Sequence, residues 1–270
     1  MRSLEGSGAL ITGGASGIGF ALAKALAARG ARIVLCDRDA AMLAAAESQL
    51  VAGGASILAL CLDVTDRTAW GVAMDKVRAF GPLHLAFANA GVAPGGAPLS
   101  VFDPAAWDRI LAVNLTGVFN TIQATVPLIR AHGEGGHIVL TSSMAGMIAA
   151  APIGDYAVTK YGVSALGEAL HTELAPDGIG VSVLYPGVVA TPLVGESRSS
   201  GMTPEAVADR VLAAIAANEL FVFTHADYRP LVAARFEAIL DAFGPSADPA
   251  FAESAGVLAM MRQTPYSAQK

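Results

Sequence analysis

The sequence predicts an α/β fold in which a mainly parallel sheet of seven strands is covered by helices on both faces. Short apolar runs of β type alternate with longer helical runs along most of the chain, which is the rhythm of βαβ units. Several of these short runs are apolar at consecutive positions, as expected for strands that are covered on both sides. A glycine-rich turn also separates the first such run from the first helical run. Together these observations indicate a doubly wound sheet.

The elements follow from the pattern in chain order. The seven strands are expected at residues 9–12, 32–36, 56–62, 83–88, 137–141, 181–184 and 220–224. Helices are expected at residues 17–29, 40–51, around 72–77, from 103 towards 130, 154–175 and 204–217. Asp103-Pro104 provides an N-cap followed by a proline in the first turn, and Pro176 ends the long helix before it. We find no linker or repeat, and we expect one domain over residues 1–270, with a substrate lid near residues 188–203.

Composition excludes several classes of function. The net charge is −6 and no basic run is present, which argues against binding to nucleic acid. No apolar stretch reaches the length of about 20 residues that a membrane span needs, and no cationic leader precedes the first strand, so we expect a cytoplasmic protein. We interpret Cys36 and Cys61 as buried, reduced thiols. No metal is expected, because the histidines show no ligand spacing and are assigned to structure: His84, His132, His137, His171 and His225.

The glycine-rich turn lies where a Rossmann-type sheet directs backbone N–H groups at a pyrophosphate. It reads Thr12-Gly13-Gly14-Ala15-Ser16-Gly17-Ile18-Gly19, and its Gly-x3-Gly-x-Gly spacing also fits a tight turn that needs positive φ angles. Asp37 follows the second strand, where a carboxylate binds ribose hydroxyls and repels a 2′-phosphate. This predicts NAD, although the adjacent Arg38 could bind that phosphate and leaves NADP open. Asp63 and Val64 follow the third strand and are expected near the adenine, with an ordinary loop carboxylate as the alternative.

Four polar residues are candidates for the chemistry. Tyr156 and Lys160 are four residues apart in an expected helix, so both side chains lie on one face. A nearby ammonium favours phenolate and should lower the tyrosine pKa toward the range of a general acid/base. Ser143 follows a strand at the edge that carries catalytic groups in open sheets, and Asn114 lies inside an expected helix, where it is a mediocre helix former. Taken singly, each has an ordinary interpretation: a chance pair, a turn serine and a buried asparagine bonded to backbone.

The motifs together resemble the short-chain dehydrogenase/reductase family over roughly residues 7 to 192. They are the turn at residues 12–19, Asn89-Ala90-Gly91, Asn114, Ser143, Tyr156-x3-Lys160 and Pro186-Gly187. The resemblance implies hydride transfer in which Tyr156 moves the proton, Ser143 polarises the carbonyl, Lys160 binds the nicotinamide ribose, and Asn114 holds a relay water. It places Asn89, Ala90, Gly91, Pro186, Gly187, Val189 and Thr191 beside the cofactor. The family's first Asn is replaced by Ala88, which puts one structural hydrogen bond in doubt.

The resemblance also implies an assembly, and the residue types expected near the carbonyl indicate a substrate class. Association through the helices that carry Asn114 and Tyr156 would give a homodimer or homotetramer. An apolar lining is expected around the carbonyl, which favours a bulky, uncharged secondary alcohol or its ketone: Val92, Pro94, Met144, Met147, Ile148, Val188, Val189, Leu193 and Val194. Arg198 leaves a substrate carboxylate open. The tail at residues 224–236 is similar to relatives that oxidise benzylic alcohols of lignin-derived dimers. The alternatives are an NADPH-dependent ketone reductase and a non-catalytic nucleotide-binding regulator on the same fold.

Overall fold

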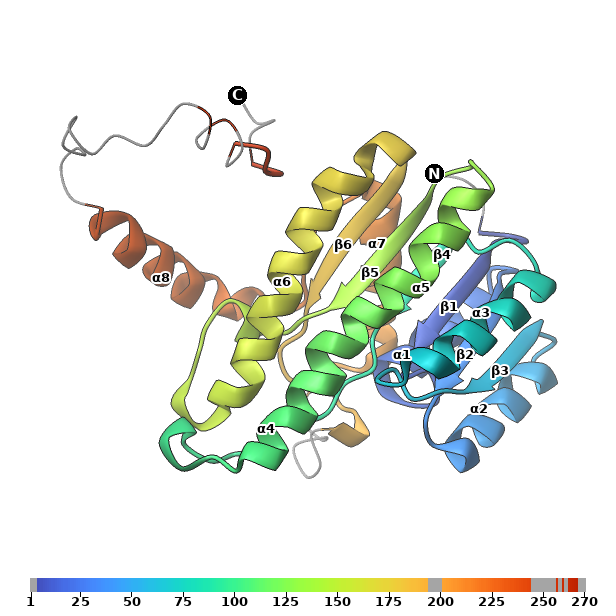
Figure 1. The fold of residues 1–270 in the computed structure, drawn as a ribbon, viewed down its shortest axis with the longest axis horizontal. Helices are drawn as coiled ribbons and strands as arrows, with labels where there is room; N and C mark the ends of the chain where they lie inside the picture. Colours follow the sequence, from blue (N-terminus) through green and yellow to red (C-terminus); the bar gives the residue numbers. More distant parts are fainter. Residues whose placement is uncertain (1–3, 194–200, 244–255, 257–258, 260–261, 267–270) are drawn as a thin grey trace.

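The computed structural model describes residues 4–193, 201–243, 256, 259 and 262–266. Its centre is a seven-stranded parallel sheet in the order β3-β2-β1-β4-β5-β6-β7, which confirms the predicted fold class (Figure 1). The strands are β1 (Gly8–Thr12), β2 (Arg32–Asp37), β3 (Ile57–Cys61), β4 (Leu85–Ala88), β5 (Gly136–Thr141), β6 (Ile179–Tyr185) and β7 (Phe221–Phe223). The chain winds outward in both directions from β1 and β4. Because every pair of neighbouring strands is parallel, the carboxyl ends of all strands meet at one edge.

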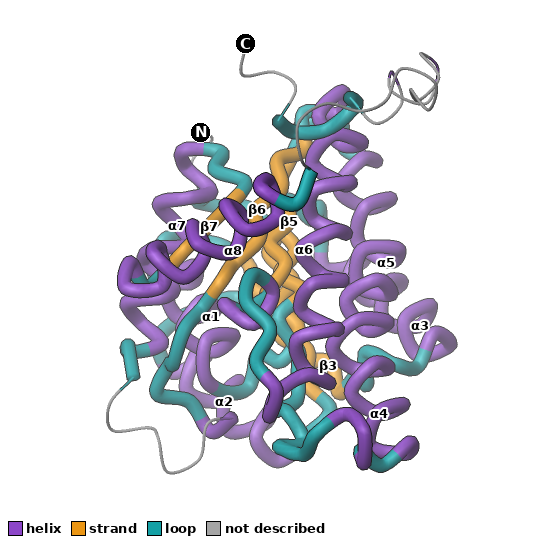
Figure 2. The backbone as a smooth tube through the Cα atoms, turned by 90° about the vertical axis from the view of Figure 1, so that its left-hand side faces the viewer, coloured by secondary structure: helices purple, strands orange, loops and turns teal. Residues whose placement is uncertain are grey.

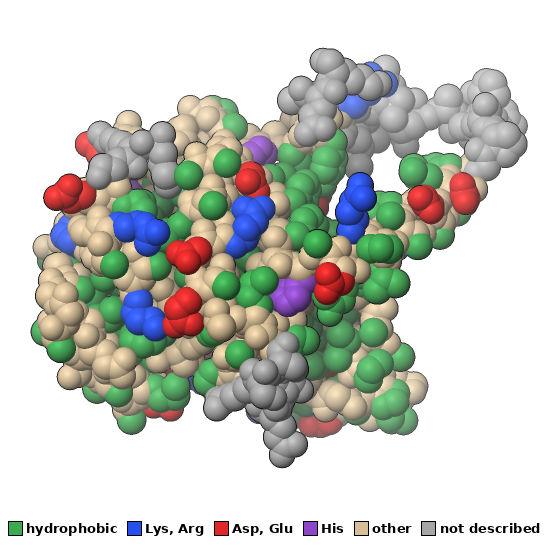
Figure 3. Space-filling view, turned by 180° about the vertical axis from the view of Figure 1, so that it is seen from behind, with side chains coloured by type: hydrophobic (Ala, Val, Ile, Leu, Met, Phe, Trp, Pro, Cys, Tyr) green, Lys and Arg blue, Asp and Glu red, His purple; other side chains and the backbone are tan. Residues whose placement is uncertain are grey.

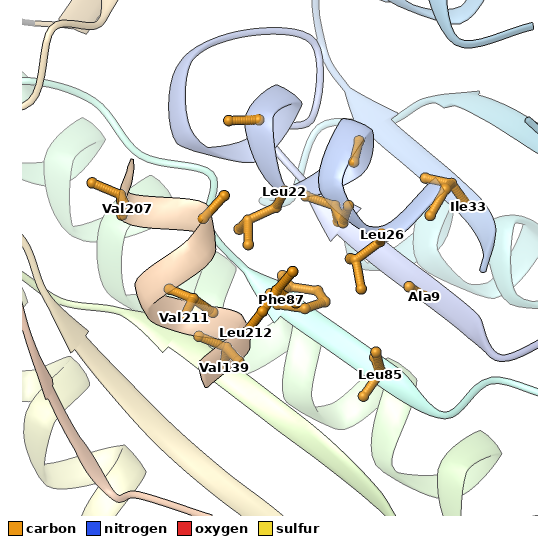
Figure 4. Packing of buried hydrophobic residues seen from close by; sticks show 14 of the residues in the cluster. Ala9, Leu22, Leu26, Ile33, Leu85, Phe87, Val139, Val207, Val211 and Leu212 are labelled. Carbon is orange, nitrogen blue, oxygen red and sulfur yellow. The ribbon is translucent and has the colours of Figure 1, made fainter. Parts of the chain in front are cut away.

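Helices cover both faces of the sheet, because each strand is apolar on both sides. The helices are α1 (Gly17–Ala27), α2 (Ala40–Ala52), α3 (Arg67–Phe80), α4 (Pro104–Leu111), α5 (Gly117–Ala131), α6 (Gly154–Leu174), α7 (Pro204–Ala217) and α8 (Arg229–Asp241). Ala9 and Ile11 of β1 pack with α1, α2 and α7, whereas Leu10 packs with α3, α5 and α6. This is the two-residue alternation of a strand. Figure 4 shows the first of these cores, with Leu22 and Leu26 of α1 near Phe87 of β4.

The expected helix from 103 towards 130 contains an irregular turn. Its start is as predicted, since the Asp103 side chain accepts hydrogen bonds from the backbone N–H groups of the first turn. Residues Ala112–Thr116 then form a π-helical turn, η2, between α4 and α5. Such turns contain one residue more than an α-helix needs and are frequent at functional sites.

Helix α8 was not predicted. It projects from the body of the fold (Figures 1 and 2) and none of its residues is buried. Apolar side chains are exposed along it, among them Leu231, Phe236 and Leu240, and Figure 3 shows hydrophobic surface on this projecting part. Among the described helices, none has the combined length and hydropathy of a membrane span.

The prediction for the cysteines was correct for one of the two. Both thiols are free, and Cys36 is buried, but Cys61 is exposed. The reason is that β3 is the edge strand of the sheet, and Cys61 is its last residue.

Candidate active site

The glycine-rich turn joins β1 to α1 at the carboxyl edge of the sheet. Gly13 and Gly17 have φ angles of +62° and +53°, in the left-handed region that favours glycine. Gly19 is required for packing, because a Cβ there would lie 2.1 Å from the carbonyl oxygen of Gly13. The turn therefore brings backbone close to backbone at the start of α1, and it leaves the first N–H groups of that helix facing the open edge.

Asp37, the last residue of β2, lies beside this turn. Its Oδ2 accepts a hydrogen bond from the N–H of Ala15 at 3.2 Å, and its Oδ1 accepts one from the N–H of Asp39 at 3.1 Å. Both carboxylate oxygens are thus oriented by backbone groups. On the next loop, hydrogen bonds from Thr65 and the charge of Arg38 hold the pKa of the Asp63 carboxyl below its ordinary value.

Asn89 ties the ends of three strands together. Its Nδ2 donates to the carbonyl oxygens of Thr12 at 3.1 Å and Gly13 at 3.3 Å, and its Oδ1 accepts from Oγ1 of Thr141 at 3.2 Å. The hydroxyl of Thr12 in turn accepts from the N–H groups of Asn89 and Ala90. These bonds fix the carboxyl ends of β1, β4 and β5 relative to one another.

A cavity of about 540 Å³ opens along this edge. It brings together nearly all residues that the sequence analysis selected for the cofactor and the chemistry: Gly13, Ser16, Gly17, Ile18, Asp37, Arg38, Asp63, Val64, Asn89, Ala90, Gly91, Ser143, Tyr156, Lys160, Pro186, Gly187, Val189 and Thr191. Gly19 is not among the residues that line the cavity. Pro192, which also lines the cavity, falls within the expected lid. Five further lining residues were not predicted, since nothing in their residue types signals a site: Leu62, Ala93, Val113, Thr141 and Ser142.

Tyr156 and Lys160 lie together on α6, with Nζ of Lys160 at 5.3 Å from the centroid of the Tyr156 ring. Nζ donates a hydrogen bond to the carbonyl oxygen of Thr141 at 2.8 Å. The lysine is only 3% exposed, and burial lowers its pKa to about 8. Burial also raises the pKa of Tyr156 to about 12, with a hydrogen bond to Ser143 acting in the opposite direction. The expected lowering of the tyrosine pKa is therefore absent from the chain alone, because loss of solvation exceeds every favourable interaction there.

Ser143 follows β5 and caps the short 3₁₀ turn Met144–Gly146. Its Oγ accepts a hydrogen bond from the N–H of Ala145 at 3.1 Å and donates to the carbonyl oxygen of Pro186 at 3.5 Å. The serine hydroxyl thus stands between Tyr156 and the turn after β6.

Asn114 occupies the π-helical turn and is fully buried. Its Oδ1 accepts from the N–H of Val92 at 2.7 Å and its Nδ2 donates to the carbonyl oxygen of the same residue at 3.0 Å. Asn114 is not among the residues that line the cavity. Its side chain holds the loop after β4 in place. Because both polar atoms of this side chain are bonded to Val92, they give no support to the expectation that Asn114 holds a relay water.

The expected apolar lining is divided between two places. Val92, Val189 and Leu193 line the cavity. Met144 and Met147 instead pack in a separate apolar cluster with Tyr185 and are not among the residues that line the cavity. Ile148 packs against that cluster, while Pro94 and Val188 are outside the cavity lining. Val194 and Arg198 lie outside the described residues, as does part of the expected lid.

One group of possible metal ligands occurs among the described residues, although the spacing of the histidines along the sequence did not indicate it. The candidate ligand atoms of His84, His132 and Glu134 lie within 4.8 Å of one another. The two ring nitrogens of His84 face the N–H of Gly8 and the Glu134 carboxylate, and those of His132 face the carbonyl of Leu83 and the N–H of Glu134. Because every ring nitrogen already has a partner, the group is explained by structure.

Comparison with known proteins agrees with this geometry. The family model described as short chain dehydrogenase matches residues 7–201. A "C alpha-dehydrogenase" of Sphingobium sp. strain SYK-6 is 30% identical over 91% of this chain and 89% of the relative. A "cyclohexanol dehydrogenase" of Acinetobacter sp. is 36% identical over 72% of this chain and 77% of the relative.

Solved structures show the same architecture. The apo form of LigD from Sphingobium sp. strain SYK-6 has a TM-score of 0.84 at 33% identity and covers 90% of this chain and 100% of its own. A short chain dehydrogenase/reductase from Burkholderia phymatum in complex with NAD has a TM-score of 0.85 at 30% identity, covering 92% and 99%. The carboxyl-edge cavity and these likenesses lead to one conclusion: the chain belongs to the short-chain dehydrogenase/reductase family of oxidoreductases.

Proposed function

We propose that this chain transfers a hydride between NAD(H) and a bulky, apolar secondary alcohol or its ketone. The observation that carries the proposal is one cavity lined by Tyr156, Lys160 and Ser143 and also by the backbone-oriented carboxylate of Asp37. A nucleotide-binding regulator would need the Asp37 region but has no use for a buried phenol and ammonium side by side.

The residues fit a dinucleotide. The left-handed glycines and the absence of room for a Cβ at Gly19 give a backbone that a pyrophosphate can approach closely. Asp37 would accept hydrogen bonds from the adenosine ribose, and its charge disfavours a 2′-phosphate. The NAD-bound relative from Burkholderia phymatum supports the same choice. When bound, the nicotinamide supplies the hydride acceptor or donor.

In the proposed mechanism each side chain has a separate task. Tyr156 gives a proton to the carbonyl oxygen during reduction and takes it back during oxidation. Ser143 donates a hydrogen bond to the same oxygen and polarises it. Lys160 binds the nicotinamide ribose and favours the phenolate of Tyr156 by its charge. Because the pKa of Tyr156 is about 12 with Ser143 and Lys160 already in place, the positive charge of the oxidised cofactor would have to lower it for the phenolate to form.

The substrate class is inferred from the lining. Val92, Val189 and Leu193 give the cavity an apolar wall, which suits a cyclic or aromatic alcohol. Likeness to a "C alpha-dehydrogenase" and the resemblance of residues 224–236 to lignin-dimer dehydrogenases support an alcohol next to an aryl ring. A panel measured by reduced-nicotinamide absorbance should therefore give the highest kcat/KM for aryl or alicyclic secondary alcohols. A small anionic hydroxy acid as the best substrate would reject this assignment.

Tyr156→Phe tests the chemistry directly. It should lower turnover by about 10²-fold to 10⁴-fold, as expected for loss of a general acid/base, while NADH binding measured by fluorescence titration stays unchanged. Tyr161→Phe is the matched control, because Tyr161 is also on α6 but its ring faces Arg235. Equal activity of the Tyr156 variant and the control would remove Tyr156 from the mechanism.

We also propose that the chain forms a homodimer or homotetramer through α5 and α6. The two helices lie side by side on one face of the sheet (Figure 1), and Phe119 and Val158 on them are 38% and 43% exposed. Phe119→Lys should shift the mass measured by light scattering toward the monomer. An unchanged mass would place the interface elsewhere.

A further inference from the structure

The peptide unit that joins Pro186 to Gly187 is held from the β7 side of the sheet. Its N–H group, contributed by Gly187, donates to Nδ1 of His225 at 3.2 Å and to Oγ1 of Thr224 at 3.3 Å. The Thr224 hydroxyl itself lies 2.6 Å from Nδ1 of His225. Because a backbone N–H can only donate, Nδ1 of His225 is an acceptor, and a neutral ring carries its proton on Nε2.

The same peptide unit is held on its other side by the residues that follow β5. The carbonyl oxygen, contributed by Pro186, accepts from the N–H of Met144 at 2.9 Å and from the hydroxyl of Ser143 at 3.5 Å. A peptide unit is planar. Fixing the direction of its N–H therefore also fixes the direction in which its carbonyl meets Ser143.

The packing shows why this position needs glycine. A Cβ on Gly187 would lie 2.8 Å from Cγ of the His225 ring. The ring therefore rests directly against the peptide, with its other contacts including the edge of the Tyr228 ring at a centroid distance of 6.3 Å. Both Pro186 and Gly187 line the cavity, whereas His225 and Thr224 lie behind them.

We propose that Thr224 and His225 are positioning residues, which set the orientation of the 186–187 peptide unit and through it the hydroxyl of Ser143. They do not touch the reacting atoms. The Ser143 hydroxyl is held by two groups, the N–H of Ala145 and the carbonyl of Pro186, and the direction of the second is set by the peptide unit. The single hydroxyl proton leaves the Pro186 carbonyl when Ser143 donates to the substrate, so the peptide unit sets the position from which the hydroxyl turns. The inference rests on the proposed function, in which Ser143 polarises the carbonyl of the substrate.

The test compares two double variants. Thr224→Val with His225→Leu removes both acceptors, whereas Thr224→Ser with His225→Asn retains a hydroxyl and a polar side chain with an acceptor close to the place of Nδ1. The apolar pair should lower kcat about tenfold or more, because small misplacements of catalytic groups are costly, with a smaller change in KM. The polar pair should recover most of the activity. Each single apolar variant should show a smaller loss, since the Gly187 N–H keeps one acceptor.

A second readout is independent of turnover and of the cofactor. Hydrogen exchange of the Gly187 amide should be faster in the apolar pair than in the polar pair and the unaltered protein. In the unaltered protein, ¹⁵N spectra of His225 at neutral pH should show an unprotonated Nδ1. The proposal would be overturned if the apolar and polar double variants had the same kcat and the same rate of Gly187 amide exchange. This holds whether both variants match the unaltered protein or both are impaired to the same extent. Lack of alcohol turnover in the unaltered protein would instead reject the proposed function, and amide exchange would still decide whether the peptide unit is held.

Discussion

Replacing Lys160 by methionine should make the cofactor-free protein more stable while abolishing its activity. The lysine is 3% exposed and burial lowers its pKa from 10.5 to about 8. At 1.36 kcal/mol for each pKa unit, the buried ammonium costs about 3 kcal/mol relative to a protein in which it is neutral. The methionine variant also loses the hydrogen bond to the Thr141 carbonyl, which lowers its stability by about 1 kcal/mol. The expected net gain for Lys160→Met is about 2 kcal/mol at pH 7.

The gain should disappear as the pH rises. With a folded pKa near 8 and an unfolded value of 10.5, the unfolded chain binds more protons between these values, so the stability of the unaltered protein increases with pH in this window. By pH 9.5 the increase amounts to about 2 kcal/mol. The advantage of the methionine variant over the unaltered protein should therefore fall to near zero.

Urea unfolding at equal protein concentration, from pH 7 to pH 9.5, measures this difference. Lys76→Met is the control, because Lys76 is an exposed residue of α3, and its variant should stay within about 0.5 kcal/mol of the unaltered protein at every pH. The reasoning would be refuted if the Lys160→Met variant were less stable than the unaltered protein at pH 7, or if the stability difference between them did not change with pH. Either result would show that the buried ammonium does not destabilise the folded protein.

Two further predictions concern the cofactor end of the cavity. Asp37→Ser should weaken NADH binding about tenfold through loss of charged hydrogen bonds and strengthen NADPH binding; fluorescence titration gives the ratio, and an unchanged ratio would contradict the assignment to NAD. Gly19→Ala forces a Cβ to within 2.1 Å of the Gly13 carbonyl, so NADH affinity should collapse and unfolding should become easier by about 1–3 kcal/mol. Gly71→Ala is the control, because a Cβ at Gly71 meets nothing within 4 Å. This variant should keep both its NADH affinity and its stability.

Much of the site could be predicted because it depends on local pattern and topology. Strands that are apolar at every position form a parallel sheet, and a parallel sheet brings residues such as Asp37, Asn89 and Ser143 to one edge however far apart they lie in the sequence. This is why single residues placed after different strands line one cavity.

The rest depends on burial, which a single run of residues does not reveal. Cys61 ends an apolar run, but its exposure follows from the position of β3 at the sheet edge. The pKa of Tyr156 is governed by loss of solvent rather than by the neighbouring lysine that the sequence displays. Helix α8 buries no residue in the described chain, and its polar and apolar residues are not separated onto two faces. It therefore lacks the periodic pattern by which a helix is recognised in a sequence.

The irregular turn at residues 112–116 makes the site sensitive to chain length. The wider π-helical turn winds by less per residue than the roughly 100° of an α-helix and so takes up one extra residue. Deleting one residue here would therefore restore a regular α-helix and remove the turn that holds Asn114. Asn114 would then lose its place opposite Val92, whose backbone N–H and carbonyl its side chain binds. One extra residue in the helix, with no change of side-chain chemistry, thus decides whether Asn114 can hold the loop that borders the cavity.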